Sequence, residues 1–186
     1  ICEVVNPSNC DTATATVVVT APVIDAVNDD FSAAPVNGYI GGTAGNVLGN
    51  DTLNGASVNP ALTTITLVNN GGLAGVSIAD NGNVTVPAGT PAGTYTITYL
   101  LCEDLNAGNC DTATAAILVD PPIIIAIDDD YSATPVNGRN GGTVGSILAN
   151  DTLNGATVNP AQTSISLLAD GGLTGVTISD TGTVTV

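Results

Sequence analysis

The sequence repeats itself at an offset of 100 residues, and this periodicity constrains the fold more than any other feature. The segment Cys2–Ala15 returns as Cys102–Ala115, and the segment Asn50–Gly55 returns as Asn150–Gly155. No insertion or deletion interrupts the alignment, and roughly 60 per cent of the aligned positions are identical. Self-similarity at a fixed period is typical of repeated structural units. We therefore expect units of about 100 residues that share one plan.

The two ends of the sequence align with positions inside the repeat. Ile1 aligns with Leu101, and Val186 aligns with Val86. We interpret the 186 residues as a window from a longer periodic polypeptide. On this interpretation, residues 1–21 are the C-terminal hairpin of a preceding repeat, residues 22–121 are a complete repeat, and residues 122–186 are the N-terminal part of the next.

Prolines mark the expected joins between repeats. Pro22 and Pro122 lie at equivalent positions, where proline either ends a strand or confines it to a sheet edge. A short linker that contains proline is stiff. We therefore expect neighbouring repeats to be held in an extended and fairly fixed relation.

The charge of the chain is strongly one-sided. Arg139 is its single basic residue, against 17 acidic residues, which gives a formal net charge of -16. Nucleic acid binding requires basic partners for the phosphates, and charge-driven binding to an anionic membrane requires the same. No apolar run is long enough to span a bilayer. The sequence therefore argues against a nucleic acid partner and against membrane insertion.

The segment Thr94–Val119 has the pattern of a long β-hairpin. Apolar residues alternate with threonine on both arms, which is the period of a half-buried strand. We expect the inward-facing row to contain Tyr95, Ile97, Tyr99, Leu101, Ala113, Ala115, Ile117 and Val119.

The cysteines lie on the opposite, threonine-bearing face of this hairpin. Cys102 ends the first arm and Cys110 begins the second, so both sulfurs leave the same side of the sheet. A cross-strand disulfide Cys102–Cys110 follows, and likewise Cys2–Cys10; two free surface thiols per pair are the alternative. Such pairs indicate an oxidising compartment.

The remaining sequence alternates short β-type runs with turn residues. We expect strands at Val23–Val27, at Val47–Leu48 and at Thr63–Val68, and a hairpin whose turn is Asn81-Gly82. About seven short strands, with turns every 8–12 residues and no helical period, predict an all-β, immunoglobulin-like β-sandwich. The sequence Gly93-Thr94-Tyr95 before a long strand is typical of a tyrosine corner.

Two sets of motifs resemble a known family. The residues Asp29-Asp30-Phe31, followed by Val47–Thr52, resemble bacterial immunoglobulin-like and cadherin-like repeats of giant surface adhesins. Tyr95–Tyr99 with Cys102 and Cys110–Thr114 resembles the version found in Bacteroidota (Flavobacterium-type) surface proteins. These include the mobile adhesins of gliding bacteria that the type IX system exports. The resemblance implies tandem repeats in an extracellular, cell-anchored fibre that extends an adhesive tip.

Recurrent aspartates near the joins are candidate calcium ligands. Calcium takes hard oxygen ligands, and cadherin-like relatives stiffen their linkers with it. The spacing matches neither an EF-hand loop nor the nonapeptide calcium repeat, and aspartate also ends strands by bonding to nearby backbone in Asx turns. Both interpretations stay open for Asp29, Asp30, Asp51, Asp129, Asp130 and Asp151.

A second motif, Asp-Thr followed by an aliphatic residue, occurs four times. It resembles the O-glycosylation acceptor of exported Bacteroidota proteins. That resemblance implies glycan sites at Thr12, Thr52, Thr112 and Thr152. The β-propensity of threonine beside a turn explains the same pattern without a glycan.

No catalytic constellation is apparent, and we expect no enzymatic activity. The chain lacks histidine, and its carboxylates are spread over turns. The favoured function is a structural stalk repeat, whose partners are the neighbouring repeats. One alternative is a subunit of a filament joined by strand or hairpin exchange. Another is an immunoglobulin-like module that binds a glycan or a surface partner, although five aromatic residues offer little stacking surface. No cofactor is expected apart from calcium.

Overall fold

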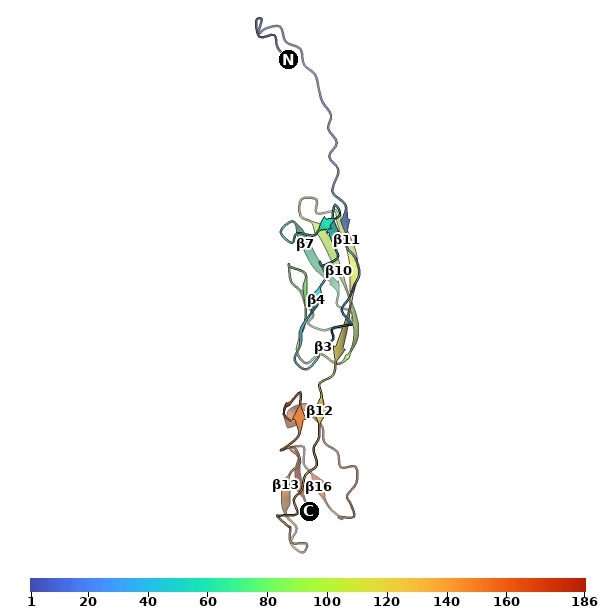
Figure 1. Cartoon of the computed structure of the whole chain (residues 1–186), viewed down its shortest axis with the longest axis vertical. Coiled ribbons are helices and arrows are strands. Elements are labelled where there is room, and N and C mark those ends of the chain that lie inside the picture. Colours follow the sequence, from blue (N-terminus) through green and yellow to red (C-terminus); the bar gives the residue numbers. More distant parts are fainter.

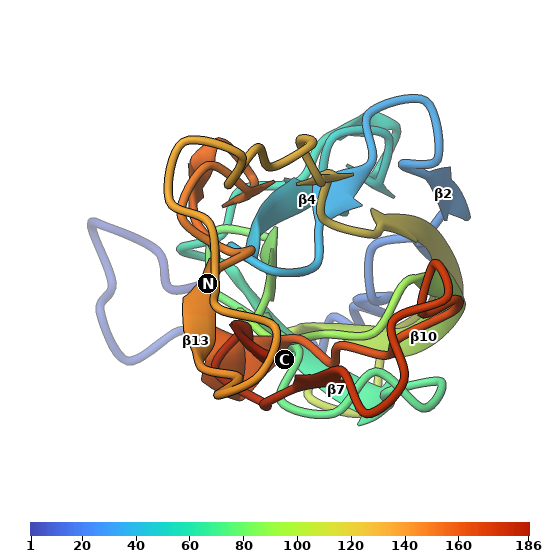
Figure 2. The ribbon, with the colours of Figure 1, turned by 90° about the horizontal axis from the view of Figure 1, so that it is seen from below.

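The computed structural model describes residues 1–186 as an elongated, all-β molecule (Figure 1). An extended N-terminal tail leads into a compact unit formed by residues 22–121, which we call the closed unit. Residues 122–186, which we call the open unit, follow along the same axis, as the end-on view also indicates (Figure 2). The one helical element is the short 3-10 turn Pro160–Gln162. No helix has the length and apolar character needed to cross a membrane.

The closed unit is built on a five-stranded sheet. Its centre is the hairpin of β10 (Gly93–Glu103) and β11 (Cys110–Asp120), and β7 (Thr63–Asn69) pairs with the outer edge of β10. On the other side, β2 (Asp29–Asp30) and β3 (Val36–Asn37) both pair with β11 in parallel.

Two smaller sheets complete the closed unit. One has the order β4-β9-β8, with β4 at Gly42–Asn46, β9 at Asn83–Val86 and β8 at Ser77–Ile78. The other has the order β1-β5-β6, with strands at Ile24–Asp25, Thr52–Leu53 and Ala56–Ser57. Side chains from these sheets and from the long hairpin form one core cluster of 16 buried residues. This is the predicted immunoglobulin-like sandwich.

The prediction of which residues of the long hairpin face the core is confirmed. Seven of the eight expected inward residues are buried, and Tyr95 is half-buried at the edge of the core. The Tyr95 hydroxyl donates to the Pro91 carbonyl at 2.8 Å, four residues upstream, which is the geometry of the predicted tyrosine corner. The hairpin predicted at Asn81-Gly82 is also present, as β8 and β9.

Two predicted strands differ in the structure. The strand expected at Val47–Leu48 lies instead at Gly42–Asn46, directly upstream. Val47 and Leu48 are both buried, because the Asn46 side chain accepts the Leu48 N–H and turns the chain inward there. The first strand comprises Ile24–Asp25 rather than the whole of residues 23–27, since the next backbone N–H groups bond to aspartate side chains.

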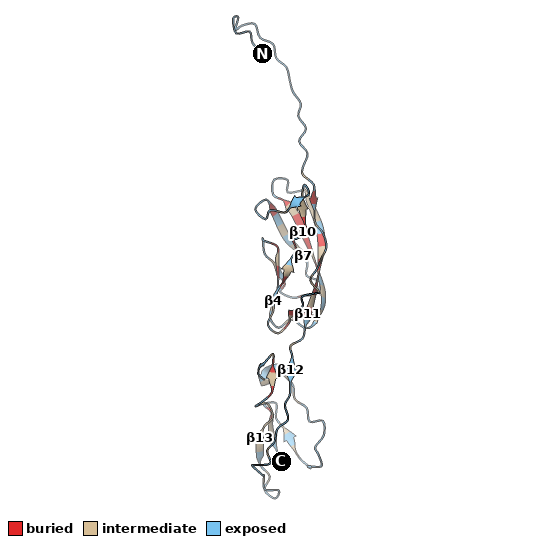
Figure 3. Cartoon of the chain, viewed as in Figure 1, coloured by how far each residue is buried: buried red, intermediate tan, exposed pale blue.

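The open unit reproduces only the two small sheets of the closed unit. The sheet of β12 (Ile124–Ile125), β14 (Thr152–Leu153) and β15 (Ala156–Thr157) matches β1-β5-β6, and each strand is offset by 100 residues from its counterpart. The sheet of β13 (Thr143–Ser146), β17 (Thr183–Thr185) and β16 (Thr177–Ile178) matches β4-β9-β8. No strand occupies the place of the long hairpin. Buried residues are accordingly concentrated in the closed unit (Figure 3).

Candidate functional site

The last strand of the closed unit, β11, pairs in parallel with two strands from the N-terminal part of the unit, β2 and β3. β2 and β3 run beside β11 in the same direction, with register pairs Ala115 to Asp29 and Val119 to Val36. The chain enters the closed unit at one end and leaves it at the other (Figure 1). A segment near the entry of the chain and the segment by which it leaves are therefore hydrogen-bonded to each other directly.

Hydrogen bonds extend this pairing beyond the short strands. The Phe31 N–H donates to the Ala116 carbonyl at 2.9 Å, and the Gly38 N–H donates to the Asp120 carbonyl at 2.9 Å. Upstream, Asn28 Oδ1 accepts from both the backbone N–H and the hydroxyl of Thr114, at 2.8 and 3.0 Å. The bonded region thus runs along β11 from Thr114 to its end.

A tyrosine inside the core connects the hairpin to two of the predicted aspartates. The Tyr99 hydroxyl lies 3.0 and 3.1 Å from the carboxylate oxygens of Asp51 and 3.3 Å from Asp29 Oδ2. Asp51, which is almost fully buried, also accepts the Val27 N–H at 2.7 Å. The Asp51 carboxylate therefore links the tyrosine of the hairpin to the backbone that leaves β1.

Burial controls the ionisation of this cluster. Desolvation, followed by the nearby Asp51 charge, raises the pKa of Asp29 to about 6. Desolvation likewise raises the pKa of Asp51. The pKa of the Tyr99 hydroxyl is raised by desolvation and, in addition, by the negative charges of Asp51 and Asp29. A hydroxyl that remains protonated can donate to the carboxylates over the whole physiological range of pH.

The predicted calcium residues do not form a common ligand set. Asp30 is exposed and accepts the Ser32 N–H at 2.9 Å, as Asp130 does from Ser132 at 2.8 Å. Asp151 accepts the Ile127 N–H at 2.8 Å. No group of three or more acidic, histidine or cysteine side chains is placed to hold a metal ion. These aspartates thus cap turns or accept hydrogen bonds from nearby backbone. Calcium binding stays a prediction that the geometry does not support.

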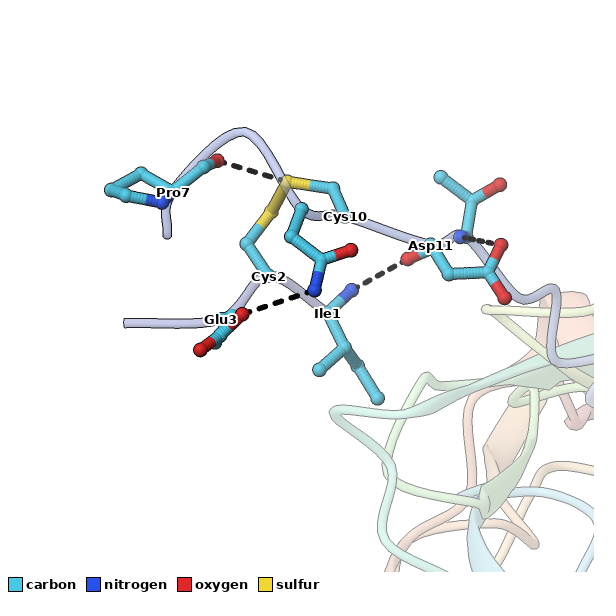
Figure 4. The surroundings of a disulfide bond; sticks show 8 residues. Ile1, Cys2, Glu3, Pro7, Cys10 and Asp11 are labelled. Carbon is cyan, nitrogen blue, oxygen red and sulfur yellow. Dashed lines mark hydrogen bonds between the residues drawn. A yellow bond between two sulfur atoms is a disulfide. The ribbon is translucent and has the colours of Figure 1, made fainter. Parts of the chain in front are cut away.

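Both predicted disulfides are present. Cys102 and Cys110 face each other across the hairpin as a direct register pair, with their Cα atoms 4.1 Å apart. Cys2 and Cys10 form the equivalent bond in the tail, where the Ile1 backbone nitrogen donates to the Asp11 carbonyl at 2.8 Å (Figure 4). No free cysteine remains.

The predicted glycosylation sites fall into two classes. Thr12 and Thr112 are exposed, whereas Thr52 and Thr152 are half-buried in β5 and β14, the central strands of their small sheets. Glycosylation at these four positions stays a prediction, and the first two offer the more accessible hydroxyls.

The junction between the two units contains contacts that sequence reasoning did not find. The side-chain amides of Asn37 and Asn154 donate to each other's oxygens, at 3.2 and 3.1 Å. Beside them, the Tyr39 hydroxyl donates to Gln162 Oε1 at 3.0 Å. Asparagine recurs at both positions in each unit, as Asn37 with Asn137 and as Asn54 with Asn154. This recurrence was the only hint of the junction contact in the sequence.

Comparison with known proteins gives no family. No family model matches the chain, and no curated protein matches it. Among solved structures, a SusE-like surface-located polysaccharide-binding protein from the Bacteroides thetaiotaomicron heparin utilisation locus aligns at 19% identity with a TM-score of 0.34, over 55% of this chain. Extracellular cadherin domains 1–4 of protocadherin gamma B7 align at 12% identity with a TM-score of 0.39, over 89%. The chain spans 15% and 40%, respectively, of those two structures.

Proposed function

We propose that the closed unit is a load-bearing spacer in the stalk of an extracellular surface adhesin, of the bacterial kind that the sequence motifs resemble. The observation that carries this proposal is the parallel pairing of β2 and β3 with β11. The mechanism is mechanical, and it requires no cofactor and no catalytic residue.

The direction of load explains why parallel pairing suits this role. Tension pulls β2 towards the N-terminal end of the unit and β11 towards the C-terminal end, so the two strands are drawn past each other. Their hydrogen bonds are then loaded together in shear. In an antiparallel pair pulled from one end, the bonds would instead break one at a time. Each bond contributes about 1 kcal/mol, so simultaneous loading makes the pairing resistant.

The junction supports the extended arrangement that a stalk needs. The Asn37–Asn154 amide pair and the Tyr39–Gln162 bond hold the open unit against the end of the closed unit. Pro121 and Pro122 limit the freedom of the linker between them. Two disulfides suit an oxidising, extracellular setting.

Single-molecule pulling tests the proposal through its geometry. Handles at Ala21 and Pro121 load the pairing in shear, whereas handles at Tyr39 and Pro121 peel β3 from the same end of β11. We expect a markedly higher unfolding force in the first geometry. Equal forces in the two geometries would contradict a load-bearing role.

A matched pair of variants locates the resistance. Asn28→Ala removes the acceptor for Thr114, so it should lower the force at which the closed unit unfolds in the shear geometry. The counterpart Asp128→Ala changes a position in the open unit that has no β11 partner, and it should leave that force unchanged. Filament formation by exchange and glycan binding remain alternative functions.

A further inference from the structure

We propose that the loop closed by the Cys102–Cys110 disulfide holds the linker at Pro22, by which the chain enters the closed unit. We call residues 103–109 the disulfide loop. The side-chain amide of Asn109, the last residue of this loop, donates to the Pro22 carbonyl oxygen at 2.8 Å, across 87 residues of sequence. The inference concerns the direction of the linker, so it does not depend on how the unit resists force.

The residues of the disulfide loop fix its shape. Glu103 is 6% exposed and accepts hydrogen bonds from the side-chain amides of Asn106, at 2.8 Å, and Asn109, at 3.0 Å. Two backbone bonds join the same residues. The Glu103 N–H donates to the Asn109 carbonyl at 3.0 Å, and the Asn109 N–H donates to the Asn106 carbonyl at 2.7 Å. Together with the disulfide, these bonds hold the Asn109 side chain in one orientation.

The same loop recurs in the tail, in a quite different environment (Figure 4). Glu3 accepts from the side-chain amides of Asn6, at 2.9 Å, and Asn9, at 3.0 Å. The Glu3 N–H donates to the Asn9 carbonyl at 2.9 Å, and all three residues are exposed. The loop therefore forms from its local sequence, without support from a core. Its shape in the closed unit is accordingly not a product of the contact with the linker.

Asn109 has one amide hydrogen for each of two partners. A side-chain amide carries two N–H donors, and the Asn109 nitrogen lies within hydrogen-bond distance of the Glu103 carboxylate and of the Pro22 carbonyl. The bond to a carboxylate is the stronger of the two. The carboxylate therefore orients the amide, and the second hydrogen is directed at the linker.

A second asparagine holds the other edge of the same linker. The Val23 N–H donates to Asn54 Oδ1 at 3.0 Å, and the Asn54 N–H donates to the Val23 carbonyl at 2.7 Å. A peptide group is planar, so its orientation is fixed when both its carbonyl and its N–H are held. The peptide group between Pro22 and Val23 is held in this way, by Asn109 and Asn54. Two side chains from distant parts of the unit thus set the direction in which the chain enters.

The open unit shows that the turn that holds the linker also lies at the junction. Asn154, the counterpart of Asn54, accepts the Ile123 N–H at 3.1 Å and bonds to Asn37 of the closed unit. One turn therefore contacts both the linker and the unit that precedes it. A linker that is held firmly keeps this turn in a constant position relative to the preceding part of the chain.

Native-state hydrogen exchange of the full chain tests the role of Asn109. In Asn109→Ala, the Val23 amide should exchange about fivefold faster relative to the Tyr99 amide, because one of the bonds that hold the linker is lost. The Tyr99 amide lies within β10 and reports opening of the whole hairpin. Asn106→Ala is the matched control, since it also removes a donor to Glu103 but no bond to the linker. It should leave the ratio of the two rates unchanged.

A second pair of variants tests whether both asparagines act on one peptide group. Asn54→Gly preserves the positive φ of the turn and removes the acceptor for the Val23 N–H. In each single variant one side of the peptide group stays held, so the NMR order parameter of the Val23 amide should stay above about 0.6. In the double variant Asn54→Gly/Asn109→Ala it should fall below about 0.6. Asn154→Gly makes the same change in the open unit and should leave Val23 unaffected.

Three results would overturn the proposal. An unchanged ratio of exchange rates in Asn109→Ala would mean that the disulfide loop does not hold the linker. An equal rise in Asn106→Ala would mean that Asn109 acts through the shape of the loop rather than through Pro22. A Val23 order parameter near 0.85 in the double variant, typical of rigid backbone, would mean that other contacts orient the linker. None of these results bears on the pulling experiment with β2 and β11.

Discussion

The closed and open units share most of their sequence over 65 aligned residues, yet they bury it very differently. Leu73 is fully buried, whereas its counterpart Leu173 is 54% exposed. The small sheets are the same in both units, down to the turn residues Asn54 and Asn154 with positive φ angles. The difference is the β10–β11 hairpin. Local sequence is therefore sufficient for the turns and the two small sheets, whereas the core requires a segment that follows them in the chain.

The largest expected difference between the units comes from truncating the same core leucine. Leu73→Ala should lower the free energy of unfolding of the closed unit by about 2–5 kcal/mol, because it leaves a cavity under the hairpin. Leu173→Ala should change the stability by less than about 1 kcal/mol, since this side chain is half in solvent. Denaturant unfolding, followed by NMR signals from each unit separately, measures both. Similar costs for the two variants would contradict the comparison.

Removing the hairpin disulfide should have the next largest effect. Replacing Cys102 and Cys110 by serine should lower the stability of the closed unit by about 2–3 kcal/mol, because the unfolded loop regains entropy. Replacing Cys2 and Cys10 is the control, since their loop lies in the tail and outside the core. Thermal unfolding of the two double variants makes the comparison, and a similar loss in both would show that the effect is not specific to the hairpin.

A glycine pair isolates the close approach of the hairpin. Gly71 and Gly171 have nearly equal positive φ angles, of 59° and 61°. A Cβ at Gly71 would clash with the Thr96 carbonyl oxygen, whereas a Cβ at Gly171 would meet no atom within 4 Å. Backbone strain is common to both alanine variants, so Gly71→Ala should cost about 1–3 kcal/mol more than Gly171→Ala. Equal losses of stability in the two variants would mean that the hairpin does not pack closely against this turn.

The smallest expected effect concerns pH. The pKa of Asp29 is about 6 in the folded state, against 3.8 when unperturbed, so the folded state binds its proton more tightly. The contribution of Asp29 to the free energy of unfolding is therefore at its maximum below about pH 4, and it is lost as the pH rises through about 6. The melting temperature of the closed unit should rise when the pH falls from 7 to 5.

Asp29→Asn tests the origin of this pH dependence. The variant should flatten the profile between pH 5 and 7, because the amide does not titrate. The counterpart Asp129→Asn should leave the profile of the closed unit as it is. A profile that stays unchanged in Asp29→Asn would assign the pH dependence to other carboxylates, such as the buried Asp51.

Much of the fold could be predicted from sequence, because the signals were local. The alternation of apolar residues with threonine in Thr94–Val119 predicted which side chains of the hairpin face the core. The same alternation placed both cysteines on the opposite face. The strand at Val47–Leu48 was wrong because two consecutive buried residues beside an Asx turn resemble a short buried strand. Periodicity alone does not separate these two cases.

The site depended on contacts between distant segments, which a single sequence does not reveal. Asp29 and Asp51 were noticed as recurring acids, but their common partner Tyr99 lies 70 residues beyond Asp29 and 48 residues beyond Asp51. Nor does the sequence indicate that β2 pairs with β11 in parallel, because short strands carry little information about their partners. The Asn37–Asn154 pair likewise depends on how the two units stack.

The most direct measurement compares one hydrogen bond that both units make at the same length. The Val47 N–H donates to the Gly82 carbonyl at 3.0 Å, and the Ile147 N–H donates to the Gly182 carbonyl at 3.0 Å. Native-state hydrogen exchange should show the Val47 amide exchanging at least about a hundredfold more slowly, because the hairpin covers it and only larger openings expose it. Equal exchange rates would contradict the claim that the hairpin, rather than the sequence that the units share, creates the stable unit.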